Sequence, residues 1–197
     1  MWNDYICPWA YAARPLSGWL ENEAAGNDIS VTPRSFELHP EIPLEGSPVR
    51  SGGRLDKVFD HIADECATAG IEFSKPSRSP NTHRVLQLVE IVQSEWPGRF
   101  SAVDDAFARA HWVEGLAIDD PEIIANILKD ASLDPEAVFE LEGLGLGARL
   151  LEESIRLARE SGVTGTPAWL VNGMVITGLH PRPQFERWIT RILERSS

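Results

Sequence analysis

Strand patterns lie at the two ends of this chain, and a long run of helical patterns separates them. Near the start, residues 2–6 form a short extended segment and residues 29–38 alternate apolar and polar side chains. Near the end, residues 168–177 read as two short strands around Asn172-Gly173, a strong signal for a tight hairpin. Strands this short are stable only when they share a sheet. The sequence therefore predicts one sheet assembled from both ends of the chain.

Apolar side chains at helical spacing fill the region between these strands. The predicted helices there cover residues 55–66, 82–96, 100–112 and 121–131, one that begins at Pro135, and residues 150–160. Two more predicted helices, residues 8–23 with a bend at Pro15 and residues 183–195, flank the strands. The prolines and glycines of residues 39–53 indicate a loop and a domain boundary, and the run Gly143, Gly145, Gly147 indicates a hinge.

These patterns predict an α/β fold with an inserted all-helical domain. Residues 1–45 and 148–197 would form a discontinuous α/β domain, and residues 46–147 the helical insertion. A chain of 197 residues is long enough to bury such a core without disulfide bonds. We find no internal repeat.

The net charge and the number of cysteines limit the classes of partner and the cellular location that we expect for this protein. The net charge of −12 repels polyanions, so we expect neither nucleic acid nor a membrane as a partner. No stretch is apolar enough to span a bilayer, and the first residues lack the pattern of a signal peptide. Two cysteines, Cys7 and Cys66, are too few for a secreted disulfide framework, which favours a reducing, cytoplasmic location.

The segment Cys7-Pro8-Trp9-Ala10 is the first candidate site. Cys7 follows a predicted strand and precedes a helix that Pro8 is suited to open. Free backbone amides and the positive end of the helix dipole favour a thiolate there, so we expect a lowered pKa at Cys7. Trp9 can shield one side of the sulfur. On its position alone, Cys7 could equally be a small buried apolar residue.

The segment Thr166-Pro167 is the second candidate site. It precedes the C-terminal sequence of strand, Asn-Gly turn, strand and helix, an order that resembles the second half of a thioredoxin fold. In that fold, the corresponding proline is cis and lies against the active-site cysteine, and the backbone of the preceding residue pairs with substrate. Without the resemblance, Pro167 would read as an ordinary turn proline before an edge strand.

Together these segments resemble the DsbA-like thioredoxin family, and most of all its cytoplasmic FrnE-like branch. The resemblance extends over nearly the whole chain, in residues 4–9, 36–40, 81–82, 118–120 and 162–173. It implies a thioredoxin domain interrupted by a helical domain. It also implies dithiol–disulfide chemistry with Cys7 as the nucleophile and Thr166 and Pro167 as the substrate loop.

The chain departs from the family's redox members at Ala10, where they carry a second cysteine. Ala10 cannot release a substrate from a mixed disulfide, and Cys66 falls on the apolar face of a predicted helix, where we expect a core residue. The family also has a longer first strand than the six residues before Cys7. Ala10 and Tyr11 bring the motif closer to a sister group, the 2-hydroxychromene-2-carboxylate isomerases and kappa-class glutathione transferases, which use one catalytic hydroxyl at the cysteine position.

The sequence leaves three functions open. The first is a thiol–disulfide oxidoreductase with a single nucleophilic cysteine, acting on disulfide-containing or glutathionylated proteins or small thiols. The second is a glutathione-dependent isomerase or transferase, and the third a non-catalytic binding module. We expect no permanently bound cofactor, glutathione as a co-substrate, and no metal site, because the five histidines form no ligand pattern. A homodimer remains open.

Overall fold

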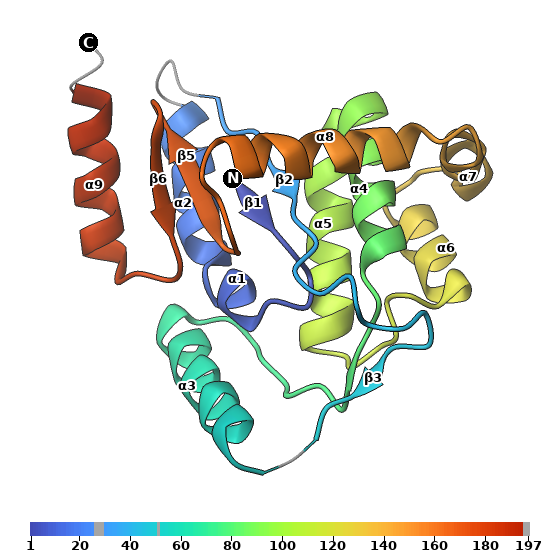
Figure 1. The fold of residues 1–197 in the computed structure, drawn as a ribbon, viewed down its shortest axis with the longest axis horizontal. Helices are drawn as coiled ribbons and strands as arrows, with labels where there is room; N and C mark the ends of the chain where they lie inside the picture. The colour runs from blue at the N-terminus through green and yellow to red at the C-terminus, as the bar shows by residue number, and fades with distance from the viewer. Residues whose placement is uncertain (26–29, 51, 195–197) are drawn as a thin grey trace.

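The computed structural model of this protein describes residues 1–25, 30–50 and 52–194. Its main sheet contains β1 (Trp2–Asn3), β2 (Arg34–Ser35), β5 (Ala168–Val171) and β6 (Met174–Thr177), in the order β2-β1-β5-β6 (Figure 1). Strand β1 is parallel to β2 and antiparallel to β5, so that Trp2 pairs with both Arg34 and Ala168. Strands from the two ends of the chain therefore lie side by side at the centre of the sheet, as the sequence predicts.

Helices cover both faces of this sheet. On one face, α2 (Arg14–Ala25) and α9 (Arg182–Glu194) share an apolar cluster with β5 and β6, which contains Leu16, Trp169 and Phe185. On the other, α8 (Leu146–Glu160) packs Ala158 against Trp2 and Ala168. The indole Nε1 of Trp2 also donates a hydrogen bond to the Ser154 carbonyl (3.1 Å). These contacts fix β1, which leads directly into the Cys7 segment.

The largest apolar core lies between the helices of the middle of the chain. It is built from α4 (His83–Glu95), α5 (Pro97–Trp112), α6 (Pro121–Asp130), α7 (Pro135–Gly143) and α8, with α4 against α5, α7 and α8. Helices α6 and α7 begin as the sequence predicts, because Asp120 and Asp134 cap their first turns and a proline follows each cap. Gly147 lies in α8 where that helix packs on α4.

Helix α3 (Arg54–Ala69) lies below α1 (Pro8–Ala12) in Figure 1 and joins the same apolar core through its buried residues Phe59, Ile62 and Cys66. Its Phe59 joins Phe73, Trp112 and Tyr11 in a cluster of stacked and tilted rings, and Tyr11 Oη donates to the Glu72 carbonyl (2.5 Å). The segments before and after α3 meet in a two-stranded ladder, β3 (Ser47–Pro48) with β4 (Arg78–Ser79). The helix is thereby held against the segment that carries Cys7.

The structure confirms the predicted fold class, a thioredoxin-like α/β fold with a helical insertion formed by the α4–α8 cluster. The domain boundaries at residues 45 and 147 stay predictions. Strand β2 occupies only two residues of the predicted strand 29–38, and Ile29 lies outside the described residues. Among the described helices, none has both the length and the apolar character that crossing a bilayer requires.

Candidate functional site

Cys7 occupies the N-cap position of α1 and is almost fully buried, with 4% of its surface exposed. Its sulfur accepts a hydrogen bond from the backbone N–H of Ala10 (3.4 Å). The thiol donates to the carbonyl oxygen of Thr166 (3.2 Å), which lies 159 residues further along the chain. The structure therefore brings the two predicted site segments, Cys7–Ala10 and Thr166–Pro167, into direct contact.

The electrostatics of Cys7 differ from the sequence expectation of a lowered pKa. Burial raises the pKa of the Cys7 thiol above its usual value, and the Asp4 carboxylate raises it further. The Ala10 amide, which donates to the sulfur, and the nearby Thr166 side chain both act to lower this pKa but do not outweigh burial. The prediction of an easily formed thiolate was wrong. It included the stabilisation of a thiolate by the helix N-terminus, but burial, which removes water from around the sulfur, could not be known from the sequence.

Pro8, Trp9 and Ala10 form the first turn of α1. Pro8 takes the N1 position, as predicted, and the Ala10 side chain is buried. The Trp9 ring packs beside the imidazole of His61 on α3, with ring centroids 5.5 Å apart. Trp9 thus connects α3 to the turn that carries the sulfur.

The Thr166–Pro167 peptide bond is cis, as the resemblance implied. Among the described residues, the Thr166 side-chain hydroxyl is buried without a hydrogen-bond partner. It acts on Cys7 in the direction of a lower pKa, because a hydroxyl can donate to a thiolate. The loop therefore offers the sulfur a carbonyl acceptor in its thiol form and a hydroxyl donor in its thiolate form.

Asp4 is a site residue that the sequence analysis did not single out. Its side chain is buried, and its carboxylate accepts hydrogen bonds from the backbone N–H of Ile6 (3.3 Å) and of Leu38 (2.8 Å). Burial raises the pKa of Asp4 to about 6. An aspartate two residues before an N–H that it binds is a recognisable turn signal. Its burial, however, depends on segments distant in sequence.

The remaining candidate site residues lie away from the Cys7 sulfur or belong to the apolar core. Cys66 is fully buried, as expected of a core residue, and burial raises its pKa to about 11. His39 pairs with Glu41 at the surface (2.8 Å). Within the described ranges, no group of three or more His, Cys, Asp or Glu side chains is arranged to hold a metal ion.

A cysteine at the first turn of a helix, in contact with the loop before β5 of a mixed sheet, defines the thioredoxin-fold class of thiol proteins. The family model of the DSBA-like thioredoxin domain matches residues 1–190, and the chain belongs to that family. This is a family of disulfide oxidoreductases and isomerases. No curated protein sequence matches the chain.

Solved structures share the fold at low sequence identity. A probable DsbA oxidoreductase, SCO1869, from Streptomyces coelicolor has a TM-score of 0.86 and 23% identity, over 98% of this chain and 88% of that one. A 2-hydroxychromene-2-carboxylate isomerase has a TM-score of 0.75 and 18% identity, over 99% and 95%. The cytosolic disulfide reductase DsbM from Pseudomonas aeruginosa, solved with GSH, has a TM-score of 0.66 and 18% identity, over 98% and 97%.

Proposed function

We propose that this protein is a glutathione-dependent thiol–disulfide oxidoreductase that acts through Cys7 alone. The observation that carries the proposal is the contact between the Cys7 sulfur and the Thr166 carbonyl (3.2 Å) at a site where Ala10 replaces a second thiol. The buried Thr166 hydroxyl supports it, because it can stabilise the thiolate that must form during exchange.

The chemistry balances with glutathione as the reductant. The Cys7 thiol loses its proton to solvent, and the thiolate attacks the glutathionyl sulfur of a substrate mixed disulfide. That S–S bond breaks, the substrate leaves as a thiolate that takes up a proton, and Cys7 carries the glutathionyl group. A second glutathione thiolate then attacks this new disulfide, which releases oxidised glutathione and the Cys7 thiolate. In total, one mixed disulfide and one glutathione thiol are consumed, and one substrate thiol and one oxidised glutathione are released, so the substrate sulfur is reduced while the glutathione sulfur is oxidised.

Several features fit this assignment. Cys66 is fully buried, so a resolving thiol from the solvent is the simpler route for release of the mixed disulfide. Glutathione is kept reduced in the cytoplasm, which agrees with the location that the low cysteine content favours. GSH is also present in the structure of the related DsbM, a cytosolic disulfide reductase by name.

The test uses oxidised glutathione and a glutathionylated peptide as probes. Incubation with oxidised glutathione should add one glutathionyl group to the protein by intact mass, and the protein with glutathione should reduce the glutathionylated peptide. Both results should disappear in Cys7→Ser and persist in Cys66→Ala, the matched control. Without added thiol, insulin disulfides should stay intact. Adduct formation at Cys66 instead of Cys7 would overturn the proposal.

A second candidate is a glutathione-dependent isomerase or transferase. It is favoured by the geometry of Cys7, whose buried thiol donates a hydrogen bond to the Thr166 carbonyl oxygen (3.2 Å) as a hydroxyl would. Burial raises the pKa of the thiol, which favours this protonated form. In that case, glutathione would bind without a covalent adduct, and Cys7→Ser would keep that binding in titration calorimetry.

A further inference from the structure

A cavity of about 440 Å³ lies between the first two helices and the helical insertion, lined by residues of β1, β2, α1, α2, α4 and α5. Ala10 and Tyr11 of α1 line it, whereas Cys7, Thr166 and Pro167 do not, so it is separate from the site described above. Pockets that bind small molecules enclose about 300–1,000 Å³ and combine apolar walls with a few polar groups. The volume of this cavity lies near the lower end of that range, which suits a small metabolite.

Several charged groups of the cavity wall bind one another. The Arg14 guanidinium donates to Asp104 (2.6 Å) and also pairs with Asp105. The Tyr5 hydroxyl donates to the second Asp104 oxygen (2.8 Å). The Asp4 carboxylate is bound by the two backbone N–H groups described above. All of these groups have partners within the chain and therefore need no ligand.

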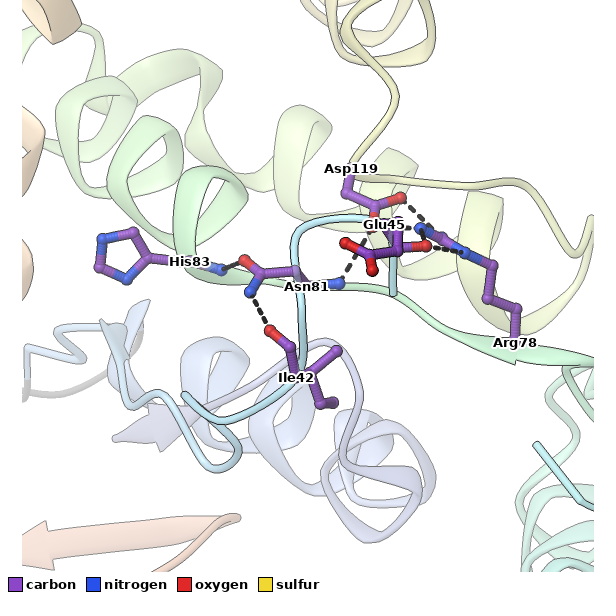
Figure 2. Close-up of polar contacts among 6 residues, drawn as sticks. All are labelled: Ile42, Glu45, Arg78, Asn81, His83 and Asp119. Carbon is purple, nitrogen blue, oxygen red and sulfur yellow. Dashed lines mark hydrogen bonds and ion pairs between the residues drawn. The ribbon is translucent and has the colours of Figure 1, made fainter. Parts of the chain in front are cut away.

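Glu90 on α4 also lines the cavity, but no cation pairs with it in the part of the chain that the structure describes. Only 7% of its surface is exposed, and one carboxylate oxygen accepts a hydrogen bond from the Ser35 N–H (2.6 Å). Figure 2 shows the contrasting case of Asp119, whose two carboxylate oxygens bind the Arg78 guanidinium (2.7 and 2.6 Å). A buried carboxylate without a cation is costly, and burial accordingly raises the pKa of Glu90. Glu90 can therefore bind a cation that its own fold does not supply.

Arg34 on β2 offers the opposite charge to the same cavity. Its side chain is half-buried and, among the described residues, forms neither a hydrogen bond nor an ion pair. Its charge lowers the pKa of Glu90, so the two groups are near each other, yet they do not pair directly. The Met1 amino group donates to the Thr32 carbonyl (3.0 Å), and burial lowers its pKa to about 5, so it is uncharged at neutral pH. Glu21, the remaining charge of the wall, is exposed to solvent on α2.

A free amino acid carries the two groups that the cavity lacks. Its ammonium can pair with a buried carboxylate, and its carboxylate can accept two parallel N–H bonds from a guanidinium. Apolar side chains of the wall, among them Val31, Val89 and Phe100, can cover an apolar side chain. We propose that this cavity binds a free α-amino acid with an apolar side chain, its ammonium group on Glu90 and its carboxylate on Arg34. The inference goes beyond the proposed function and does not depend on it.

Ligands with only one of the two charges fit the cavity less well. An amine without a carboxylate leaves Arg34 unpaired and places a second cation near it. A carboxylic acid without an amine leaves Glu90 unpaired and places a second anion near it. A hydrogen bond between charged groups contributes enough that either loss should weaken binding about tenfold or more. The zwitterion also has no net charge, so the net charge of −12 on the protein does not repel it.

The experiment is titration calorimetry of the full chain with L-leucine, L-methionine and L-phenylalanine. At least one of them should bind saturably, with one site per chain. Phenethylamine and 3-phenylpropanoate, which lack the carboxylate and the ammonium of phenylalanine, should each bind at least about tenfold more weakly than phenylalanine. Absence of binding by all three amino acids at millimolar concentration would overturn the inference, as would equal binding of phenylalanine and its two analogues.

Two variants assign the charges of the ligand to the two side chains. Glu90→Gln should weaken phenylalanine about tenfold but leave 3-phenylpropanoate, which has no ammonium, at least as tightly bound as before. Arg34→Gln should weaken phenylalanine about tenfold and leave phenethylamine at least as tightly bound. A merely structural role for either side chain would weaken all three ligands alike, and that result would contradict the assignment. If Glu90→Gln fails to fold, the wild-type ligand series and Arg34→Gln still decide.

Matched controls remove the same charges elsewhere. Glu152→Gln and Arg149→Gln lie at exposed positions of α8, outside the cavity wall, and should bind phenylalanine as the wild type does. Cys7→Ser should also keep this binding, because Cys7 does not line the cavity. Loss of phenylalanine binding in Cys7→Ser would show that the ligand occupies the thiol site instead, and would overturn the inference.

Discussion

Replacement of Gly147 by alanine should destabilise the protein, although alanine is the better helix former. Gly147 lies in the first turn of α8, where that helix packs on α4. An added Cβ would come within 2.9 Å of Gln87 Cβ, 3.0 Å of the Gln87 carbonyl oxygen and 3.1 Å of Ile91 Cδ1. Two of these atoms belong to parts of α4 that cannot swing away, so the helices must separate by a few tenths of an ångström.

The magnitude follows from two opposing effects. Overpacking of a well-packed helix contact costs about 1–3 kcal/mol, and the gain in helix propensity is at most about 1 kcal/mol. The net loss should be about 1–2 kcal/mol in the free energy of unfolding. Gly143→Ala is the matched control, because Gly143 is exposed in the last turn of α7 and an added Cβ there meets no atom within 4 Å. We expect it to be neutral or stabilising by up to about 0.5 kcal/mol.

Urea unfolding followed by circular dichroism measures both variants. Gly147→Ala should lower the midpoint with an unchanged m-value, and its thermal midpoint should fall about 3–8 °C below that of Gly143→Ala. If the two variants unfold at the same urea concentration, α8 and α4 do not approach each other as closely as the structure shows.

Three further results are expected. Buried His111, whose pKa falls to about 4, binds fewer protons in the folded than in the unfolded state between pH 6.5 and 4. Stability should therefore fall as the pH drops through this window, by up to about 3 kcal/mol, and His111→Gln should flatten that loss in urea titrations at several pH values. Asp120→Ala should remove the N-cap bond to Glu122 N–H (2.8 Å) and cost about 1 kcal/mol in unfolding free energy. Ala10→Cys should gain insulin reduction with dithiothreitol, and no gain would show that the position cannot serve as a resolving thiol.

The helical part of the fold could be predicted well from sequence because its signals are local. Asp120-Pro121 and Asp134-Pro135 combine an N-cap with an N1 proline, and the structure begins helices at both. The β3–β4 ladder was missed because Ser47–Pro48 and Arg78–Ser79 are two-residue strands with no alternation to detect. The Gly143–Gly147 run could be read only as a break, whereas its last glycine is required by the contact with α4.

The two segments that form the site could be predicted from the sequence, but the burial and the charges around Cys7 could not. The motif that carries Cys7 and the loop that carries Thr166 were found from sequence, and the structure joins them. The raised pKa of Cys7 could not be found, since it depends on burial by distant segments. Asp4 escaped notice for the same reason: its partners Leu38 and Thr82 are far along the chain.

The central pairing of β1 with β5 also sets the order in which the protein can form during synthesis. Trp2 and Ala168 must meet before the β1–β5 pairing exists, and the ribosome delivers Ala168 long after Trp2. The helices between them are built on contacts of shorter sequence separation and can fold earlier. A nascent chain therefore carries Cys7 without its Thr166 contact until residue 166 has been translated, so a product truncated before that residue would hold a thiol with no exchange site.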